Sequence, residues 1–270
     1  LTSGHKDTVK AYMDGIFKLL KQGSLSADQA IQLLAAKSDK GTPGLHWALD
    51  KEHTDTIKAY MDGIAKLLKQ RSLSADQAIQ LLAAKNDTGY PGLNMAIGTG
   101  HANTVKAYID GILNLLKQAS LSCDQAVQLL AAKDTKGYPG LYWALGNGHT
   151  DTVKAYIDGI LNLLKQASLS CDQAVQLLAA KDTKGYPGLY WALGNGHTDT
   201  VNACMDAILN RPEGHALRKD QMIHLLVKLN EKINLFNLLL FSPHNDINHF
   251  ANVLASRLEP PQQETPTQAQ

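Results

Sequence analysis

The sequence predicts an all-α fold, a helical solenoid in which each unit of 48 residues contributes about three helices. One phrase recurs at a constant interval of 48 residues, marked by Gly41, Gly89, Gly137 and Gly185. Residues 105–152 recur without change as residues 153–200. Apolar residues follow helical spacing throughout, and the alternation typical of strands is absent. Such units bury their apolar faces only against their neighbours, which gives a linear array.

Each unit begins with a turn and a short helix. In the unit that starts at Gly137, the pair Pro139-Gly140 predicts the turn. Apolar side chains at spacings of three and four then share one face over residues 141–145. Gly146 and Gly148 predict the end of this helix.

A second helix of about four turns follows, and Thr150 is positioned to cap it. Its apolar stripe is formed by Val153, Tyr156, Ile157, Ile160, Leu161 and Leu164. Gly159 interrupts the helix, and a glycine costs about 1 kcal/mol there relative to alanine. We interpret it as a point where the helices of adjacent units pack closely.

The third helix of the unit is predicted from Asp172 to about Lys181. Ser170 and Gln173 have the spacing of a capping box, in which each side chain bonds to the backbone of the other residue. The same box recurs at Ser26/Gln29, Ser74/Gln77 and Ser122/Gln125.

The domain boundaries follow from where the repeat is intact. Residues 1–210 form the predicted array, with a truncated first unit, and residues 211–258 form a degenerate C-terminal capping repeat. Residues 259–270 are rich in proline and glutamine and are predicted to be disordered. Leu1 lies inside a repeat phrase, so we expect the natural protein to continue upstream.

The phrase resembles an ankyrin repeat, whose signature reads G-x-T-P-L-H-x-A-A-x-x-G-H-x-x-x-V. Matching positions are Gly137, Leu141, Ala144, Gly148, His149 and Val153, and the Leu-His pair is present as Leu45-His46. The unit departs from the signature in two ways: Pro139-Gly140 replaces Thr-Pro, and the unit exceeds the usual length of about 33 residues by a whole helix. The resemblance therefore implies a three-helix variant.

The narrower resemblance is to ankyrin-like arrays of secreted bacterial effectors, in particular the EspL type. It implies a protein-protein interaction module that binds a host protein after delivery into the host cell cytosol, or otherwise in the cytoplasm. In that family a cysteine-protease part lies upstream of the repeats. Two alternatives remain: a structural spacer, or part of a catalytic domain that uses the histidines outside the regular repeat, His215, His224, His244 and His249.

Composition argues against several other classes of function. The formal net charge is +1 with mixed signs, so nothing attracts nucleic acid or an anionic membrane surface. Apolar runs stay far below the roughly 18 residues of a membrane span. No nucleotide-binding fingerprint is present, and we predict no cofactor. The partner expected from these exclusions is a protein, with self-association through the N-terminal end as a further option.

One histidine per unit forms a series that invites a metal site. Ligand atoms must lie about 2 Å from one ion, whereas neighbouring helices pack about 8–10 Å apart. We therefore predict no metal site and interpret these histidines as turn residues that bond to backbone groups. They are His5, His53, His101, His149 and His197.

The three cysteines give no sign of catalysis. Cys123 and Cys171 occupy equivalent places in successive units and are predicted to be free thiols at the start of a helix. Cys204 stands where Tyr156 stands in the preceding unit and is predicted to fill the core. We predict no catalytic residue in the chain and expect that it is not an enzyme.

The candidate binding surface consists of the positions that vary between units, in the turns and short helices. Tyrosine is common there, and it is enriched in binding hot spots. The predicted protein-binding residues are His46, Tyr90, Asn94, Tyr138, Tyr142, Asn147, Tyr186, Tyr190 and Asn195. The alternative is that the rings pack between neighbouring turns. Trp47, Met95, Trp143 and Trp191 are expected in the core between units.

Overall fold

The computed structural model describes residues 5–118, 120–167, 169–209 and 217–233, and this part of the chain is all-α. In the described residues, the second helix of each unit is α1 (Lys6–Lys21), α4 (Thr54–Lys69), α7 (Ala102–Lys117), α10 (Thr150–Gln166) or α13 (Thr198–Leu209). Four short helices precede the last four of these: α3 (Gly44–Asp50), α6 (Gly92–Gly98), α9 (Gly140–Gly146) and α12 (Gly188–Gly194). The remaining helices are α2 (Ala27–Leu34), α5 (Ala75–Ala83), α8 (Cys123–Leu130), α11 (Cys171–Leu178) and α14 (Lys219–Ile233).

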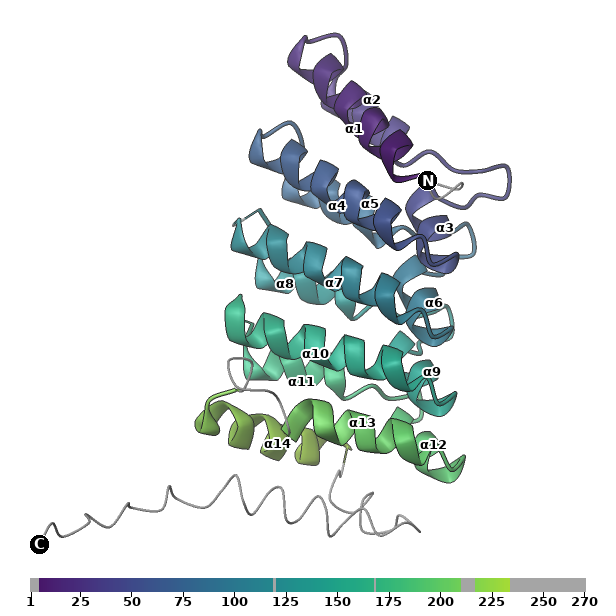
Figure 1. Ribbon diagram of the computed structural model, residues 1–270, viewed down its shortest axis with the longest axis vertical. Helices are drawn as coiled ribbons and strands as arrows, with labels where there is room; N and C mark the ends of the chain where they lie inside the picture. The colour runs from purple at the N-terminus through teal and green to yellow at the C-terminus, as the bar shows by residue number, and fades with distance from the viewer. Residues whose placement is uncertain (1–4, 119, 168, 210–216, 234–270) are drawn as a thin grey trace, which may run out of the picture.

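The helices are arranged in layers and columns (Figure 1). A layer is one unit, such as α9, α10 and α11, and the layers follow one another in sequence order. Each helix packs on its equivalent in the next layer: α1 on α4, α4 on α7, α7 on α10 and α10 on α13, with the short helices stacked in the same way. This order of packing agrees with the all-α prediction and is compatible with a helical solenoid.

The capping boxes predicted from the sequence are present at the start of α2, α5, α8 and α11. Ser170 Oγ accepts from Gln173 N at 3.1 Å, and Gln173 Oε1 accepts from Ser170 N at 2.9 Å. The same glutamine also donates through Nε2 to Asp124 Oδ1 of the preceding layer at 2.7 Å. α11 ends at Leu178, short of the predicted Lys181, because Lys181 pairs with Pro187 in an isolated β-bridge before the next short helix.

The start of the second helix differs from the prediction. α10 begins at Thr150, and its N-cap is His149, with no hydrogen bond from a capping side chain. Thr150 Oγ1 lies instead 2.7 Å from Thr200 Oγ1 in the next layer. Thr150 therefore joins two layers and does not cap its own helix.

The glycine in the second helix of a unit marks a close contact with the layer before it, as predicted, except at Gly15 of α1, which has no atom within 4 Å of a Cβ position. A Cβ atom at Gly159 of α10 would lie 2.8 Å from Ile109 Cγ2 of α7, closer than side-chain atoms tolerate. Gly111 stands in the same relation to Met61, with 2.5 Å to Met61 Cε. Only hydrogen fits at these points, which explains why the cost of a glycine within a helix is tolerated.

Buried tyrosines link the second helix of one layer to the third helix of the layer before it. Tyr108 Oη donates to Leu82 O at 2.8 Å, and Tyr156 Oη donates to Leu130 O at 3.1 Å. Cys204 takes the equivalent place in α13 and is buried, which confirms its prediction as a core residue.

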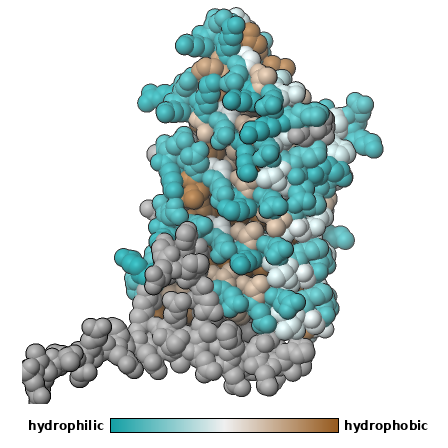
Figure 2. All heavy atoms as spheres, viewed as in Figure 1, coloured by the Kyte–Doolittle hydropathy of each residue, from teal (hydrophilic) through white to brown (hydrophobic). Residues whose placement is uncertain are grey.

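The surface is mainly polar on the side that Figure 2 shows, where hydrophilic side chains cover most of the described layers. No helix in the described ranges combines the length and apolar character required to cross a membrane.

Candidate functional site: turns and short helices

Each turn before a short helix is held by one polar side chain. Asp134 Oδ1 accepts from Lys136 N at 2.8 Å and from Tyr138 N at 2.9 Å. Its Oδ2 accepts from Trp143 Nε1 at 3.0 Å. A turn with three such bonds has little freedom, so the side chains at its tip are presented in a constant orientation.

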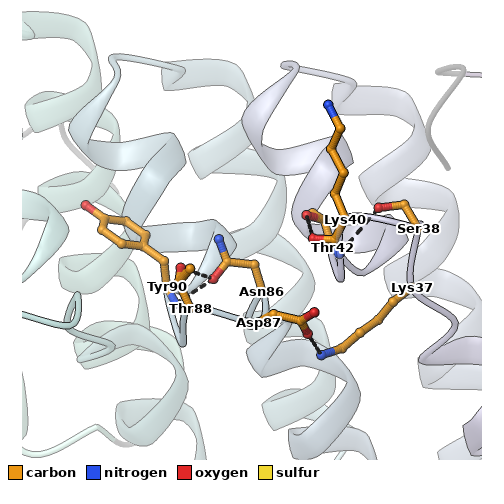
Figure 3. A network of polar contacts seen from close by, with 8 residues as sticks. All are labelled: Lys37, Ser38, Lys40, Thr42, Asn86, Asp87, Thr88 and Tyr90. Atoms are coloured by element: carbon orange, nitrogen blue, oxygen red, sulfur yellow. Dashed lines mark hydrogen bonds and ion pairs between the residues drawn. The ribbon is translucent and has the colours of Figure 1, made fainter.

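Figure 3 shows the two preceding turns, in which the same position carries a weaker group. Asn86 Oδ1 accepts from Tyr90 N at 2.9 Å and from Thr88 Oγ1 at 2.7 Å. Ser38 Oγ accepts only from Thr42 N, at 3.4 Å. The turns therefore become more strongly held along the chain from Ser38 to Asp134.

The turns of adjacent layers are also connected to each other. Lys37 Nζ lies 2.6 Å from Asp87 Oδ1 of the next turn (Figure 3). Both side chains are exposed, so the pair contributes at most about 1 kcal/mol. Gly41 has φ of +67°, and a Cβ atom there would overlap the Asp87 carboxylate. This turn requires glycine for its backbone and for its neighbour.

The most exposed of the predicted binding tyrosines lie on the last turn and on α12. Tyr186 is 49% exposed and Tyr190 is 47% exposed, and their ring centroids are 5.6 Å apart. Trp191 is 40% exposed and meets Tyr190 edge-on. We call Tyr186, Tyr190 and Trp191 the α12 aromatic cluster. The prediction that Trp191 belongs to the core is wrong, because no described helix covers this side of α12.

The same three residue types are largely covered one layer earlier. Tyr142 is only 8% exposed, since Gly188 of α12 packs against it so closely that a Cβ there would lie 2.9 Å from Tyr142 Cα. Tyr138 and Trp143 are half-buried and contact Tyr142 with centroid distances of 5.1 and 5.5 Å. Tyr142 is therefore not accessible, which agrees with the alternative that the rings pack between neighbouring turns.

Two further predicted binding residues are buried in the stack. Asn94 is 1% exposed, and its Nδ2 donates to Ala132 O at 3.2 Å and Tyr138 O at 2.9 Å in the next layer. His46, its equivalent, is 4% exposed, and neither ring nitrogen has a hydrogen-bond partner. In these two units the position is a contact between layers and is not part of an accessible face.

The remaining predicted residues lie at the surface. Tyr90 is half-buried, whereas Asn147 and Asn195 are exposed. Asn195 Nδ2 donates to Gly146 O at 2.9 Å, and Asn147 Nδ2 donates to Gly98 O at 3.4 Å. These bonds hold each asparagine against the preceding layer, with one edge open to solvent.

The histidine series lies where turns of adjacent layers meet. His197 Nε2 lies 3.1 Å from Gly146 O, a backbone contact of the kind predicted from the sequence. His101 Nδ1 lies 3.6 Å from Glu52 Oε2 in the layer before it. Within the described ranges, no three His, Cys, Asp or Glu side chains are grouped so that they could hold a metal ion.

Two of the three cysteines, Cys171 and Cys204, have environments that disfavour the reactive thiolate. Burial raises the pKa of Cys204 to about 12, and burial together with Asp172 raises the pKa of Cys171. Cys123 Sγ donates to Ala167 O at 3.4 Å. His224 is exposed on α14, and the other histidines proposed for catalysis, His215, His244 and His249, lie outside the described residues.

Sequence reasoning missed two features of the stack, the threonine contacts between layers and a cavity beside Tyr60. Comparing units could have drawn attention to the threonines, since the phrase Thr-Asp-Thr recurs at Thr150 and Thr198, but it does not show that Thr150 meets Thr200. No sequence signal indicates the cavity, because the sequence around Tyr60 differs from that around Tyr108 and Tyr156 only by conservative apolar changes.

Comparison with known proteins does not assign the chain to a family. No protein-family model matches the chain, and a search of curated proteins found no match.

Proposed function

We propose that this chain is a protein-protein interaction module, a helical solenoid of ankyrin-like repeats whose turns and short helices bind a protein. The observation that carries the proposal is the α12 aromatic cluster, in which three large rings are each at least 40% exposed and Tyr190 contacts the other two. Exposed rings of this kind lose apolar contact with water when a partner covers them.

The cluster is also well suited to recognition because it is already ordered. Asp182 Oδ1 accepts from Lys184 N and Tyr186 N, each at 2.8 Å, which holds the turn that carries Tyr186. Tyrosine and tryptophan lose little rotamer freedom on binding and offer both apolar area and a polar group. A partner would therefore gain contact area at a low entropic cost.

The partner we propose is a host protein, and the chain would be the target-binding repeat region of a secreted bacterial effector that acts in the host cell cytosol. This finer part rests on the resemblance of the repeated phrase to ankyrin-like effector arrays. The near-neutral charge supports a protein in preference to nucleic acid.

A capture experiment tests the proposal. The tagged chain is incubated with eukaryotic cell lysate, and bound proteins are identified by mass spectrometry. We expect a partner that is retained by the natural chain and lost by a Tyr186→Ala/Tyr190→Ala variant. The matched control is Ile223→Ala/Val227→Ala, which removes two exposed apolar side chains from α14 and should retain the partner.

Two outcomes would contradict the proposal. Capture by none of the three chains would favour a structural spacer. Equal loss in the control variant would indicate general adhesion to exposed apolar surface. Circular dichroism of all three chains establishes that the variants are folded before binding is compared.

A further inference from the structure

Between the first two layers lies a cavity that the repeat pattern does not predict and that is open to solvent on one side. Its volume is about 400 Å³, and its wall includes Leu34, Ala35, Tyr60, Leu81, Ala84 and Lys85. This volume falls in the range of about 300–1,000 Å³ that small-molecule sites occupy. In Figure 1 the layer of α1 and α2 is tilted against the layer that follows.

A hydrogen bond found in later layers is missing at this cavity. Tyr108 and Tyr156 each donate to the carbonyl of a leucine 26 residues earlier, Leu82 and Leu130. The corresponding pair here is Tyr60 Oη and Leu34 O. Tyr60 is 2% exposed and lines the cavity, yet its hydroxyl has no hydrogen-bond partner among the described residues.

The missing bond leaves a donor and an acceptor on the wall of one apolar space. Burial raises the pKa of Tyr60, so the hydroxyl remains a donor at neutral pH. Pro43 and Leu45 extend the apolar lining. The lining also includes the exposed side chains of Lys37, Gln80 and Lys85, and the Lys37 ammonium is paired with Asp87 at 2.6 Å.

We propose that this cavity binds an aliphatic alcohol, whose hydroxyl accepts from Tyr60 Oη and donates to Leu34 O while its chain lies along the leucine side chains. A hydroxyl group is both a donor and an acceptor of hydrogen bonds. It can therefore bond to Tyr60 Oη and to Leu34 O at the same time. Neither a hydrocarbon nor an ionised carboxylate offers this pair of contacts. The proposal is independent of the protein-binding function.

The test is a titration of the isotope-labelled chain with octanol, in which NMR spectroscopy monitors the chemical shifts of the backbone amides. We expect saturable shifts confined to α2, α4 and α5. Tyr60→Phe keeps the ring and removes the hydroxyl, and it should weaken octanol binding about tenfold, as the loss of one buried hydrogen bond implies. Tyr108→Phe is the matched control and should leave the octanol affinity unchanged, because Tyr108 Oη already has a partner.

A second variant tests the site by filling the cavity with a larger side chain. Ala35→Phe places a ring in an open cavity, so the chain should remain folded while octanol binding is lost. Absence of saturable shifts with octanol overturns the proposal, as does equal weakening by Tyr60→Phe and Tyr108→Phe. Binding of octanoate as tightly as octanol also overturns it, and would identify Lys85 as a partner for an anion.

Discussion

Thr150 Oγ1 lies 2.7 Å from Thr200 Oγ1, and the two hydroxyls belong to adjacent layers. They stand at different positions of the repeated phrase: Thr150 begins its helix, and Thr200 is the third residue of the next one. Thr54 and Thr104 repeat the contact two layers earlier at 3.3 Å. The pair of hydroxyls therefore forms only where the second helix of the preceding unit begins with a threonine.

Thr152 is the case in which the first helical residue of the preceding unit has no hydroxyl group. It is 1% exposed, its Oγ1 has no hydrogen-bond partner, and the residue that would supply one is Ala102. We predict that Ala102→Thr raises the free energy of unfolding by about 1 kcal/mol, the net value of a typical hydrogen bond. Thermal or urea unfolding measures the effect. Ala102→Val has the same shape without the hydroxyl, and a gain of equal size in that variant would refute the explanation.

The glycines of the longer helices should respond to alanine in opposite directions. Gly159→Ala forces a Cβ to within 2.8 Å of Ile109 Cγ2, so we expect a loss of about 1–3 kcal/mol from overpacking. Gly15→Ala, at the same position of α1, meets nothing within 4 Å and should gain up to about 1 kcal/mol through helix propensity. Denaturant unfolding of both variants checks the prediction, and the same sign for both would contradict it.

The hydroxyl groups of Tyr108 and Tyr60 should contribute different amounts to the free energy of unfolding. Tyr108→Phe leaves Leu82 O without its donor in a buried place, so we predict a loss of about 1–2 kcal/mol. Tyr60→Phe removes a hydroxyl that has no protein partner and should change stability by less than about 0.5 kcal/mol. Urea unfolding at neutral pH compares them. A larger loss for Tyr60→Phe would show that its hydroxyl does bond to the protein.

His46 should make the fold sensitive to mild acid. Burial lowers its pKa, so the folded chain holds His46 neutral while the unfolded chain protonates it near the usual value of about 6.5. The unfolded state then binds more protons below that pH, and stability should fall as the pH drops from about 6.5 toward 5. At higher pH this contribution is fully present.

His46→Asn should remove that sensitivity. Asparagine at the equivalent position, Asn94, donates to two carbonyls of the next layer, so the variant should be more stable than the natural chain, with the larger gain below pH 6.5. Thermal unfolding at pH 5 and pH 8 tests this. An equal difference at both pH values would mean that His46 does not titrate as its burial implies.

The sequence was most informative where a local pattern determines the structure. The capping boxes at Ser122 and Ser170 start helices because both partners lie within one turn. The close approach at Gly159 was predictable because a glycine within a repeated helix requires a neighbour that occupies the space. These features need only the unit and an identical copy beside it.

Exposure of the candidate binding residues could not be predicted in the same way. Tyr142 and Tyr190 have identical sequence around them, yet one is 8% exposed and the other 47%. The difference arises from what covers each short helix, and Tyr142 lies beneath α12. Asn94 and His46 varied between units as surface residues do, but they are buried contacts between layers.

The role of the α12 aromatic cluster is tested by the dissociation constant of the captured partner, measured with purified proteins by calorimetry. We predict that Tyr186→Ala/Tyr190→Ala weakens binding at least tenfold, because truncating residues of a hot spot costs more than about 1 kcal/mol each. Ile223→Ala/Val227→Ala should leave the constant within about twofold, since single surface changes outside an interface have small effects. An unchanged constant for the tyrosine variant would show that the α12 aromatic cluster is not the binding surface.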